Sequence, residues 1–202
     1  METTTNLESF DENRSIQVIR EMIEVSQKKL KNDGILFILW GWVMFYICFT
    51  SFVFKITKIS WEVQNIFGLA GIVLLILNII LSVYYIFKKR KKVQTYIGIS
   101  LKYVWFSMIA TLIITYLIQF NILHSIKFEL QHALFMIIVA FATVTTGGIL
   151  RHKLIITGGI LFGIFALLST YVPSEYQFLI EAIAWLIAFV IPGHILYAKR
   201  NS

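Results

Sequence analysis

The residues with the clearest chemical potential are a few glutamates and histidines that fall within or beside long apolar stretches. Glu129 and His132 are three positions apart, so a helix through them places a carboxylate and an imidazole on one face. Glu181 lies in the apolar segment FLIEAIAWL, and His124 precedes Glu129 by one short connection. Ionisable side chains inside a membrane are costly and mark candidate functional sites. Glu181, Glu129, His132 and His124 are therefore candidate ligands for a proton or a metal ion.

A Glu-x-x-His pair is part of one known metal-binding arrangement. Helical bundles that bind two metal ions take this pair from two helices and add further glutamates, whereas the sequence contains the pair once. No confident metal site and no cofactor are therefore predicted. In the alternative interpretation, Glu129 and His132 lie at the membrane interface, and Glu181 forms a hydrogen bond with a neighbouring helix.

Residue patterns typical of hydrolytic enzymes are missing from the sequence. It contains neither GxSxG nor HExxH, and no histidine is close in sequence to Cys48, the one cysteine. Near the end of the chain, Pro192 is expected to kink a helix and His194 to lie at the level of the lipid headgroups. No catalytic residue is assigned, and we expect a protein that is not an enzyme.

Long apolar stretches divide the chain and supply the elements that position these residues. The 202 residues are 58% hydrophobic and 14% charged, and their mean hydropathy is +0.78, outside the range of ordinary soluble domains. An apolar helix of about 20 residues crosses the ~30 Å hydrocarbon layer of a membrane. We predict an all-α polytopic membrane protein whose residues 34–202 form a six-transmembrane-helix bundle. The expected spans are about 35–54, 65–87, 102–123, 129–150, 154–172 and 176–197.

Residues 1–33 form a separate polar segment before the first span. Apolar side chains recur within it at a near-helical period, and Ser9 and Glu12 have the spacing of a capping box. The predicted element is an amphipathic cytoplasmic helix that ends at Asn32-Asp33-Gly34. Three placements are open: on the membrane surface, packed beneath the bundle, or docked on a cytoplasmic protein partner through residues 9–33.

Basic residues are distributed unevenly among the segments that flank the spans. Only Lys55, Lys58 and Lys127, of 18 basic residues, fall in the alternate connections. By the positive-inside rule, this bias places both the N-terminus and the C-terminus in the cytoplasm. Membrane topology thus accounts for the net charge of +7, and no nucleic-acid partner is expected. The run expected to contact anionic lipid headgroups is Lys88, Lys89, Arg90, Lys91 and Lys92.

The pentapeptide TGGIL occurs twice, at 146–150 and 157–161, on either side of Arg151-His152-Lys153. A phosphate-binding loop needs a preceding strand and a Lys-Ser/Thr pair, and neither accompanies this repeat. If the basic triplet forms a turn, the two copies fall at similar depth on antiparallel helices. Small residues let helices approach closely in a membrane, so a tight helical hairpin is predicted. The glycines expected at helix contacts are Gly147, Gly148, Gly158, Gly159 and Gly163.

Two stretches carry a resemblance: KKLKNDGILFILWGW, after the amphipathic segment, and IPGHILYAKR, near the end of the chain. They resemble a loosely defined group of small, uncharacterised bacterial multi-span inner-membrane proteins. The resemblance covers the first span and the tail, and it implies a location in the plasma (inner) membrane of a bacterium. No activity and no functional residues are carried over with it.

Three functions are consistent with these features. The first is a non-enzymatic membrane sensor, regulator or assembly subunit that engages a partner through its cytoplasmic face. The second is a small transporter or channel that acts as a homo-oligomer, with a path along Glu181 and the polar residues of the third span. The third is a metal-dependent membrane enzyme that uses Glu129 and His132. The first is preferred because the polar segment before the first span is the one organised element outside the membrane.

Overall fold

The structure, a computed structural model, describes residues 2–57, 59–88, 96–125 and 127–198. Lys89–Lys92 and the basic residues of the tail therefore lie outside the described residues. All secondary structure in the described segments is helical. The helices are α1 (Glu2–Ile56), α2 (Trp61–Lys88), α3 (Tyr96–Leu123), α4 (Phe128–Ile149), α5 (Lys153–Ser169), α6 (Ser174–Trp185), the π-helical turn η2 (Leu186–Val190) and α7 (Ile191–Ala198).

Five helical segments are long and apolar enough to cross a membrane. They are Gly34–Ile56, Trp61–Tyr85, Gly98–Leu123, Phe128–Ile149 and the continuous run Ser174–Ala198. The fold expected from the sequence, an α-helical membrane protein, is consistent with this arrangement. α5 is also apolar but has only 17 residues, about 25 Å of helix at 1.5 Å per residue. The sixth span therefore stays a prediction.

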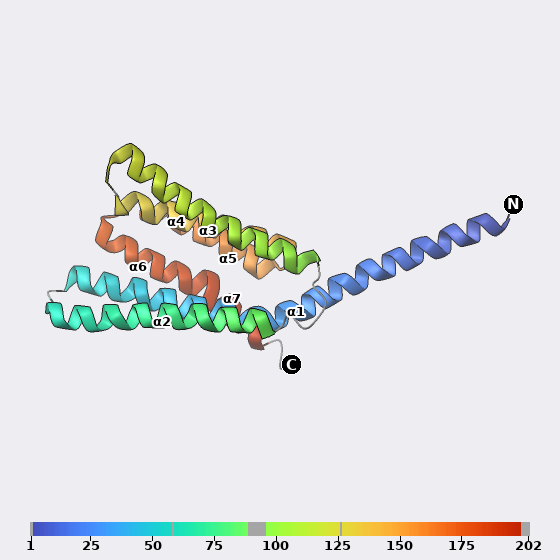
Figure 1. Ribbon diagram of the computed structural model, residues 1–202, viewed down its shortest axis with the longest axis horizontal. Coiled ribbons are helices and arrows are strands. Elements are labelled where there is room, and N and C mark those ends of the chain that lie inside the picture. The colour runs from blue at the N-terminus through green and yellow to red at the C-terminus, as the bar shows by residue number, and fades with distance from the viewer. Residues whose placement is uncertain (1, 58, 89–95, 126, 199–202) are drawn as a thin grey trace.

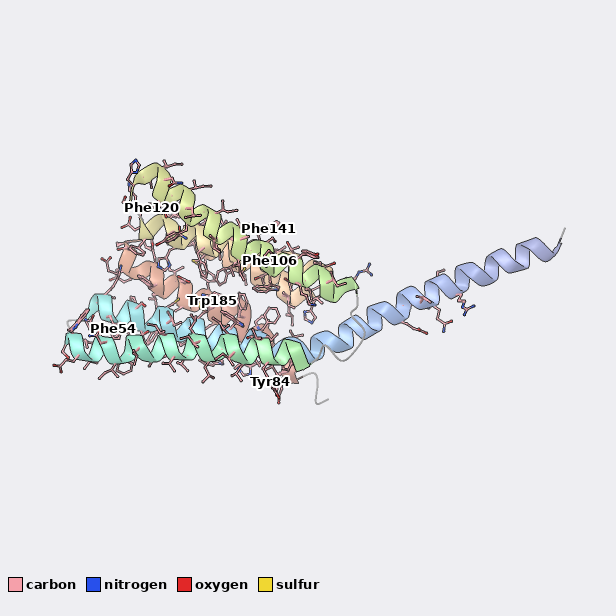
Figure 2. The ribbon with its side chains drawn as sticks, viewed as in Figure 1. Phe54, Tyr84, Phe106, Phe120, Phe141 and Trp185 are labelled. Carbon is pink, nitrogen blue, oxygen red and sulfur yellow. The ribbon has the colours of Figure 1, made fainter. Side chains whose placement is uncertain are left out.

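The helices are arranged side by side around a central run of α6, η2 and α7 (Figure 1). This run packs against α1 on one side and α5 on the other, and α4 pairs with α5. α2 lies outside α1, and α3 lies outside α4. Figure 2 shows the result: Trp185 points into the interior, whereas Phe106 and Phe141 are on the exposed surface. Exposed aromatic and aliphatic side chains on the outer helices are suited to contact lipid tails.

α1 continues without interruption through the position where the sequence predicts its end. That prediction, a break at Asn32-Asp33-Gly34, is wrong, because the helix runs from Glu2 to Ile56. Gly34 has no positive φ. A Cβ added to Gly34 would lie 3.1 Å from Leu196 Cβ and 3.2 Å from the Gly193 carbonyl oxygen. The glycine thus permits close contact between α1 and α7. The N-terminal half of α1 projects beyond the bundle (Figure 1), and the opposite end is called the distal end below.

The glycines of the TGGIL repeats face different neighbours. A Cβ on Gly147 would lie 2.7 Å from the Ile156 backbone nitrogen, and one on Gly159 would lie 2.8 Å from the Val144 backbone nitrogen. These two glycines lie where α4 and α5 meet. A Cβ on Gly158 would instead approach the Ala188 carbonyl oxygen of η2 at 2.9 Å. Gly148 faces open space, and Gly163 has room for a methyl group.

The turn between α4 and α5 closes with two backbone hydrogen bonds. His152 N–H donates to the Gly147 carbonyl and Arg151 N–H donates to the Gly148 carbonyl, which is the Schellman pattern of helix ends. Arg151 occupies the left-handed position of this motif, with φ 51°. The turn keeps the two helices antiparallel from their first contact.

The irregularity expected at Pro192 is a π-helical turn just before it. Proline has no N–H, so the Ala188 carbonyl cannot receive the usual bond from the residue four positions later. The Ile191 N–H donates to the Leu186 carbonyl, five positions back. The missing donor of Pro192 is therefore accommodated by one wide turn inside the membrane-length helix.

One polar side chain in the α1–α2 interface has no hydrogen-bond partner within the described residues. Asn78 is 2% exposed, and neither Oδ1 nor Nδ2 is bonded. One turn later, Ser82 Oγ accepts a hydrogen bond from Trp40 Nε1 at 3.1 Å. A buried amide without partners is costly in an apolar environment.

The Asn78→Leu variant is expected to be more stable than the natural protein by about 1 kcal/mol, because it removes an unsatisfied amide and keeps the number and branching of the side-chain heavy atoms. Stability is measured as the midpoint of unfolding in increasing proportions of denaturing detergent. Ser82→Ala is the matched control, and we expect it to lose stability because Trp40 Nε1 loses its acceptor. A loss of stability in Asn78→Leu would contradict the assignment of Asn78 as unpartnered.

Candidate functional site between α1, α4 and α6

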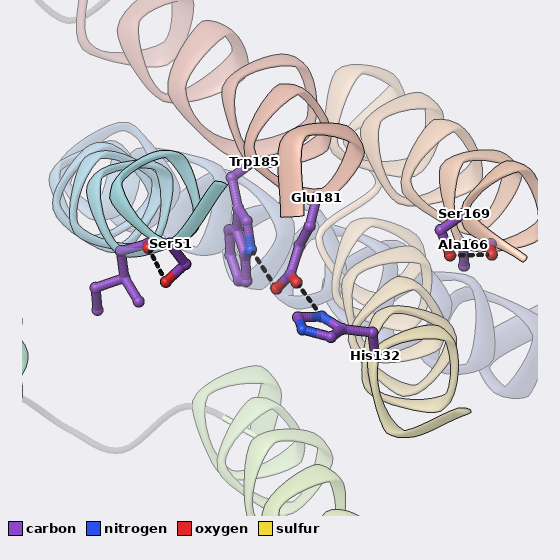
Figure 3. Close-up of polar contacts among 7 residues, drawn as sticks. Ser51, His132, Ala166, Ser169, Glu181 and Trp185 are labelled. Atoms are coloured by element: carbon purple, nitrogen blue, oxygen red, sulfur yellow. Dashed lines mark hydrogen bonds and ion pairs between the residues drawn. The ribbon is translucent and has the colours of Figure 1, made fainter. Parts of the chain in front are cut away.

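The carboxyl group of Glu181 forms an ion pair with His132 across the interface of α6 and α4. His132 Nδ1 lies 2.5 Å from Glu181 Oε2, as Figure 3 shows. Glu181 is in the second turn of α6 and His132 is in the second turn of α4. Both helices begin at the distal end, so the pair lies at similar depth on two neighbouring helices. The side chain of Glu181 is 3% exposed and that of His132 is 18% exposed.

Trp185 holds the second oxygen of the same carboxyl group. Its Nε1 donates to Glu181 Oε1 at 3.3 Å, across one turn of α6. The indole is buried and packs on Phe162 and Phe189, with ring centroids 5.1 Å and 4.4 Å away. This aromatic cluster fills the interior between Glu181 and the projecting end of the bundle. Glu181 is therefore closed off on that side.

A third helix reaches Glu181 through Cys48 of α1. Cys48 is buried, and its thiol lies near the Glu181 carboxyl group. Other nearby hydroxyl groups bond to their own helices. Ser51 Oγ donates to the Ile47 carbonyl at 2.8 Å, and Ser169 Oγ donates to the Ala166 carbonyl at 2.7 Å. Glu181 is thus the point where α1, α4 and α6 meet through polar side chains.

His132 also contacts an aromatic ring that lies beside a cation. The His132 and Phe178 rings meet edge to face, with centroids 4.3 Å apart. Lys55 Nζ lies 4.8 Å from the centroid of the Phe178 ring, a distance typical of cation–π contacts. Positive charge is therefore present one ring away from the imidazole. Gln177, one turn before Glu181, is also buried, and its Oε1 has no partner within the described residues.

The remaining residues singled out from the sequence are not part of this cluster. Glu129 and His124 have exposed side chains, and His132 is paired with Glu181. Within the part of the chain that the structure describes, no group of three or more His, Cys, Asp or Glu side chains is arranged to hold a metal ion. The predicted lipid-contacting lysines are described only as far as Lys88, the last residue of α2.

The polar residues of the third span are also separate from Glu181. α3 packs on α4, at the edge of the molecule (Figure 1). Thr115 Oγ1 donates to the Thr111 carbonyl at 2.7 Å, and Gln119 Nε2 donates to the Lys127 carbonyl at 3.1 Å. The hydrogen bonds that these residues form are local, and Gln119 Oε1 is buried without a partner within the described residues.

Two members of the cluster were not identified from the sequence. Trp185 is four residues after Glu181, and helical spacing alone places these side chains side by side. Cys48 comes from a distant helix, and no local pattern indicates its contact with Glu181. Comparisons with family models, curated proteins and solved structures give no match for this chain.

Proposed function

We propose that the protein is a non-enzymatic sensor, regulator or assembly subunit of a bacterial inner membrane, with six spans and both termini in the cytoplasm. One observation carries the proposal: α1 runs unbroken from Cys48, which is buried near Glu181 where α1 packs on α6, to Glu2 beyond the bundle. A continuous helix transmits a shift or rotation along its length. A change at the α1–α6 interface would therefore reach the segment 9–33, which is proposed to dock a cytoplasmic protein.

The orientation in this proposal rests on the positions of the basic residues. Lys88, Arg151 and Lys153 lie at helix ends on the same side of the bundle as the projecting half of α1. Lys55 and Lys127 are the basic residues of the distal end within the described chain. The positive-inside rule then favours a cytoplasmic N-terminal segment and a distal end that faces outward. Anionic headgroups are the proposed lipid partners of the basic side.

The alternative of an oligomeric transporter receives less support from the geometry. A transport path needs access to its central site from both sides of the membrane, whereas Trp185, Phe162 and Phe189 close the inner side of Glu181. The polar residues of α3 do not join Glu181. The metal-dependent enzyme has two candidate ligands, Glu129 and His132, and His132 is engaged with Glu181.

The proposal is tested by affinity purification of three forms of the protein in mild detergent. The first is the full chain, the second lacks residues 2–33, and the third carries a five-residue Gly/Ser insertion after Asp33. We expect a cytoplasmic protein to be retained by the first form and lost from the second. The third form keeps every docking residue but interrupts α1, so it should still bind the partner. Identical sets of retained proteins in the first two forms would exclude docking through this segment.

A further inference from the structure

We propose that His132 and Glu181 form a proton-binding site that is loaded from the distal end of the bundle through His132. Transmission of a change at this site along α1 to the segment 9–33 rests on the proposed function, whereas proton binding itself does not. The proton is the only species that moves: it adds to the free nitrogen of the imidazole or to the carboxylate, and no other bond changes. The juxtaposition that carries the inference is the 2.5 Å contact between Nδ1 and Oε2, inside a membrane-length helix pair.

The pair is electrically neutral only when it holds one acidic proton. That proton is either on the imidazole, which gives an imidazolium beside a carboxylate, or on the carboxyl group. A second proton leaves the pair with a net positive charge, and loss of the proton leaves it net negative. Because charge is costly in an apolar environment, each change in proton number alters the forces on the three helices that meet at Glu181. A proton is therefore a ligand to which this interface responds.

Few other titratable or charged groups face the pair, and His124, which follows α3, is exposed. From α1 these are Cys48, beside Glu181, and Lys55, one ring away from His132. On α4, Glu129 lies one turn from His132 and is exposed. On α6, Glu175 is two turns before Glu181 and half-buried. The α5 side chains near α6 are apolar or small; the titratable residue of α5, Lys153, lies at the opposite end of the bundle.

Access to the site is one-sided. His132 is the more exposed partner, and it lies toward the distal end. Glu181 is covered on the other side by Trp185 and the aromatic rings packed on it. A proton that enters through His132 must leave by the same route. Such a site reports the acidity of one compartment and does not conduct protons, which is the behaviour of a sensor.

Proton binding is measurable directly by NMR on the full chain in lipid nanodiscs, with histidine labelled by ¹⁵N and glutamate by ¹³C. The chain has four histidines, and His132→Asn assigns the signal of interest by its disappearance. Ring nitrogen shifts distinguish imidazolium from the two neutral tautomers. In the natural protein, the His132 nitrogens and the Glu181 carboxyl carbon are expected to change together across the same pH interval, since coupled groups titrate as a pair.

Glu181→Gln supplies the second arm of the experiment. Removal of the carboxylate is expected to change the pH interval over which the His132 ring nitrogens respond, because the paired carboxyl group no longer takes part in proton binding. Glu129→Gln, the same substitution at an exposed glutamate one turn from His132, is the matched control and should change this interval far less. Equal changes in both variants, or independent titration of His132 and Glu181 in the natural protein, would overturn the proposal.

If Glu181→Gln fails to fold, the NMR titration of the natural protein alone decides whether His132 and Glu181 bind protons as a pair. The NMR result is also separate from the purification of cytoplasmic partners. A coupled titration without a retained partner leaves the proton site in place and removes the docking function. A retained partner without coupled titration supports the docking function and overturns the proton site.

Discussion

Gly147→Ala is expected to destabilise the contact between α4 and α5 by about 1–3 kcal/mol, the range for overpacking a filled interior. The added methyl group would lie 2.7 Å from the Ile156 backbone nitrogen and 2.8 Å from Ile156 Cγ1. A backbone atom in the facing helix cannot rotate away, so the two helices must separate. Helix association in a membrane depends on close packing, and the separation therefore loses contacts along the hairpin.

Gly148→Ala is the matched control for this prediction, because no atom of another helix lies within 4 Å of the added methyl group. Both glycines are in the last turn of the same helix, so effects of helix propensity are shared. Gly159→Ala and Gly163→Ala form a second pair on α5, with nearest atoms at 2.7 Å and 3.6 Å. Unfolding midpoints in denaturing detergent should fall for Gly147→Ala and Gly159→Ala only. Equal midpoints within each pair would mean that α4 and α5 are not in close contact.

Glu181→Leu is expected to destabilise the protein by about 3 kcal/mol, the lower end of the range for breaking a buried ion pair. The lower end applies because the side chain of His132 is 18% exposed and partly solvated. The variant leaves Trp185 Nε1 without its acceptor and His132 without the carboxyl group that lies beside it. His132→Leu leaves Glu181 without its partner and should have a comparable cost.

The double variant His132→Leu/Glu181→Leu is expected to be more stable than the sum of the single effects by about 1–3 kcal/mol. Apolar side chains in both positions remove the unpaired polar groups that each single variant creates. The four unfolding free energies form a double-mutant cycle. His124→Leu combined with Glu181→Leu serves as the control cycle, because His124 is exposed and outside the cluster. An additive His132/Glu181 cycle would show that the pair is not an energetic unit.

Much of the helical architecture could be predicted from the sequence, because its signals are local. Apolar length and connecting polar residues locate the helices of membrane length to within a few residues. The repeated TGGIL marks two helices that the structure places side by side. α5 ends at Ser169, shortly before the predicted end of the fifth span at about residue 172, because backbone N–H groups of Thr170 and Tyr171 bond three residues back in a tight turn.

The candidate site was predictable only in part. Glu181 is conspicuous because it is an acid within an apolar segment, and Trp185 follows from helical spacing. The pairing of His132 with Glu181 and the approach of Cys48 depend on which helices are neighbours, and the sequence has no local signal for that. Gly34 shows the same limitation. Its sequence context, after Asn32-Asp33, is typical of a helix end, but contact with Gly193 explains the glycine within a continuous helix.

The π-helical turn at Leu186–Val190 has a consequence for the helix faces on either side of it. Glu181 and Gly193 both contact α1, through Cys48 and through Gly34 and Ile38 respectively. In a regular α-helix, residues twelve positions apart point about 120° away from each other. A π turn accommodates one extra residue, which reduces that angle to about 20°. The extra residue in the π turn therefore brings Glu181 and Gly193 onto nearly the same face of the helix. This allows α1 to contact both ends of a helix whose faces would otherwise diverge.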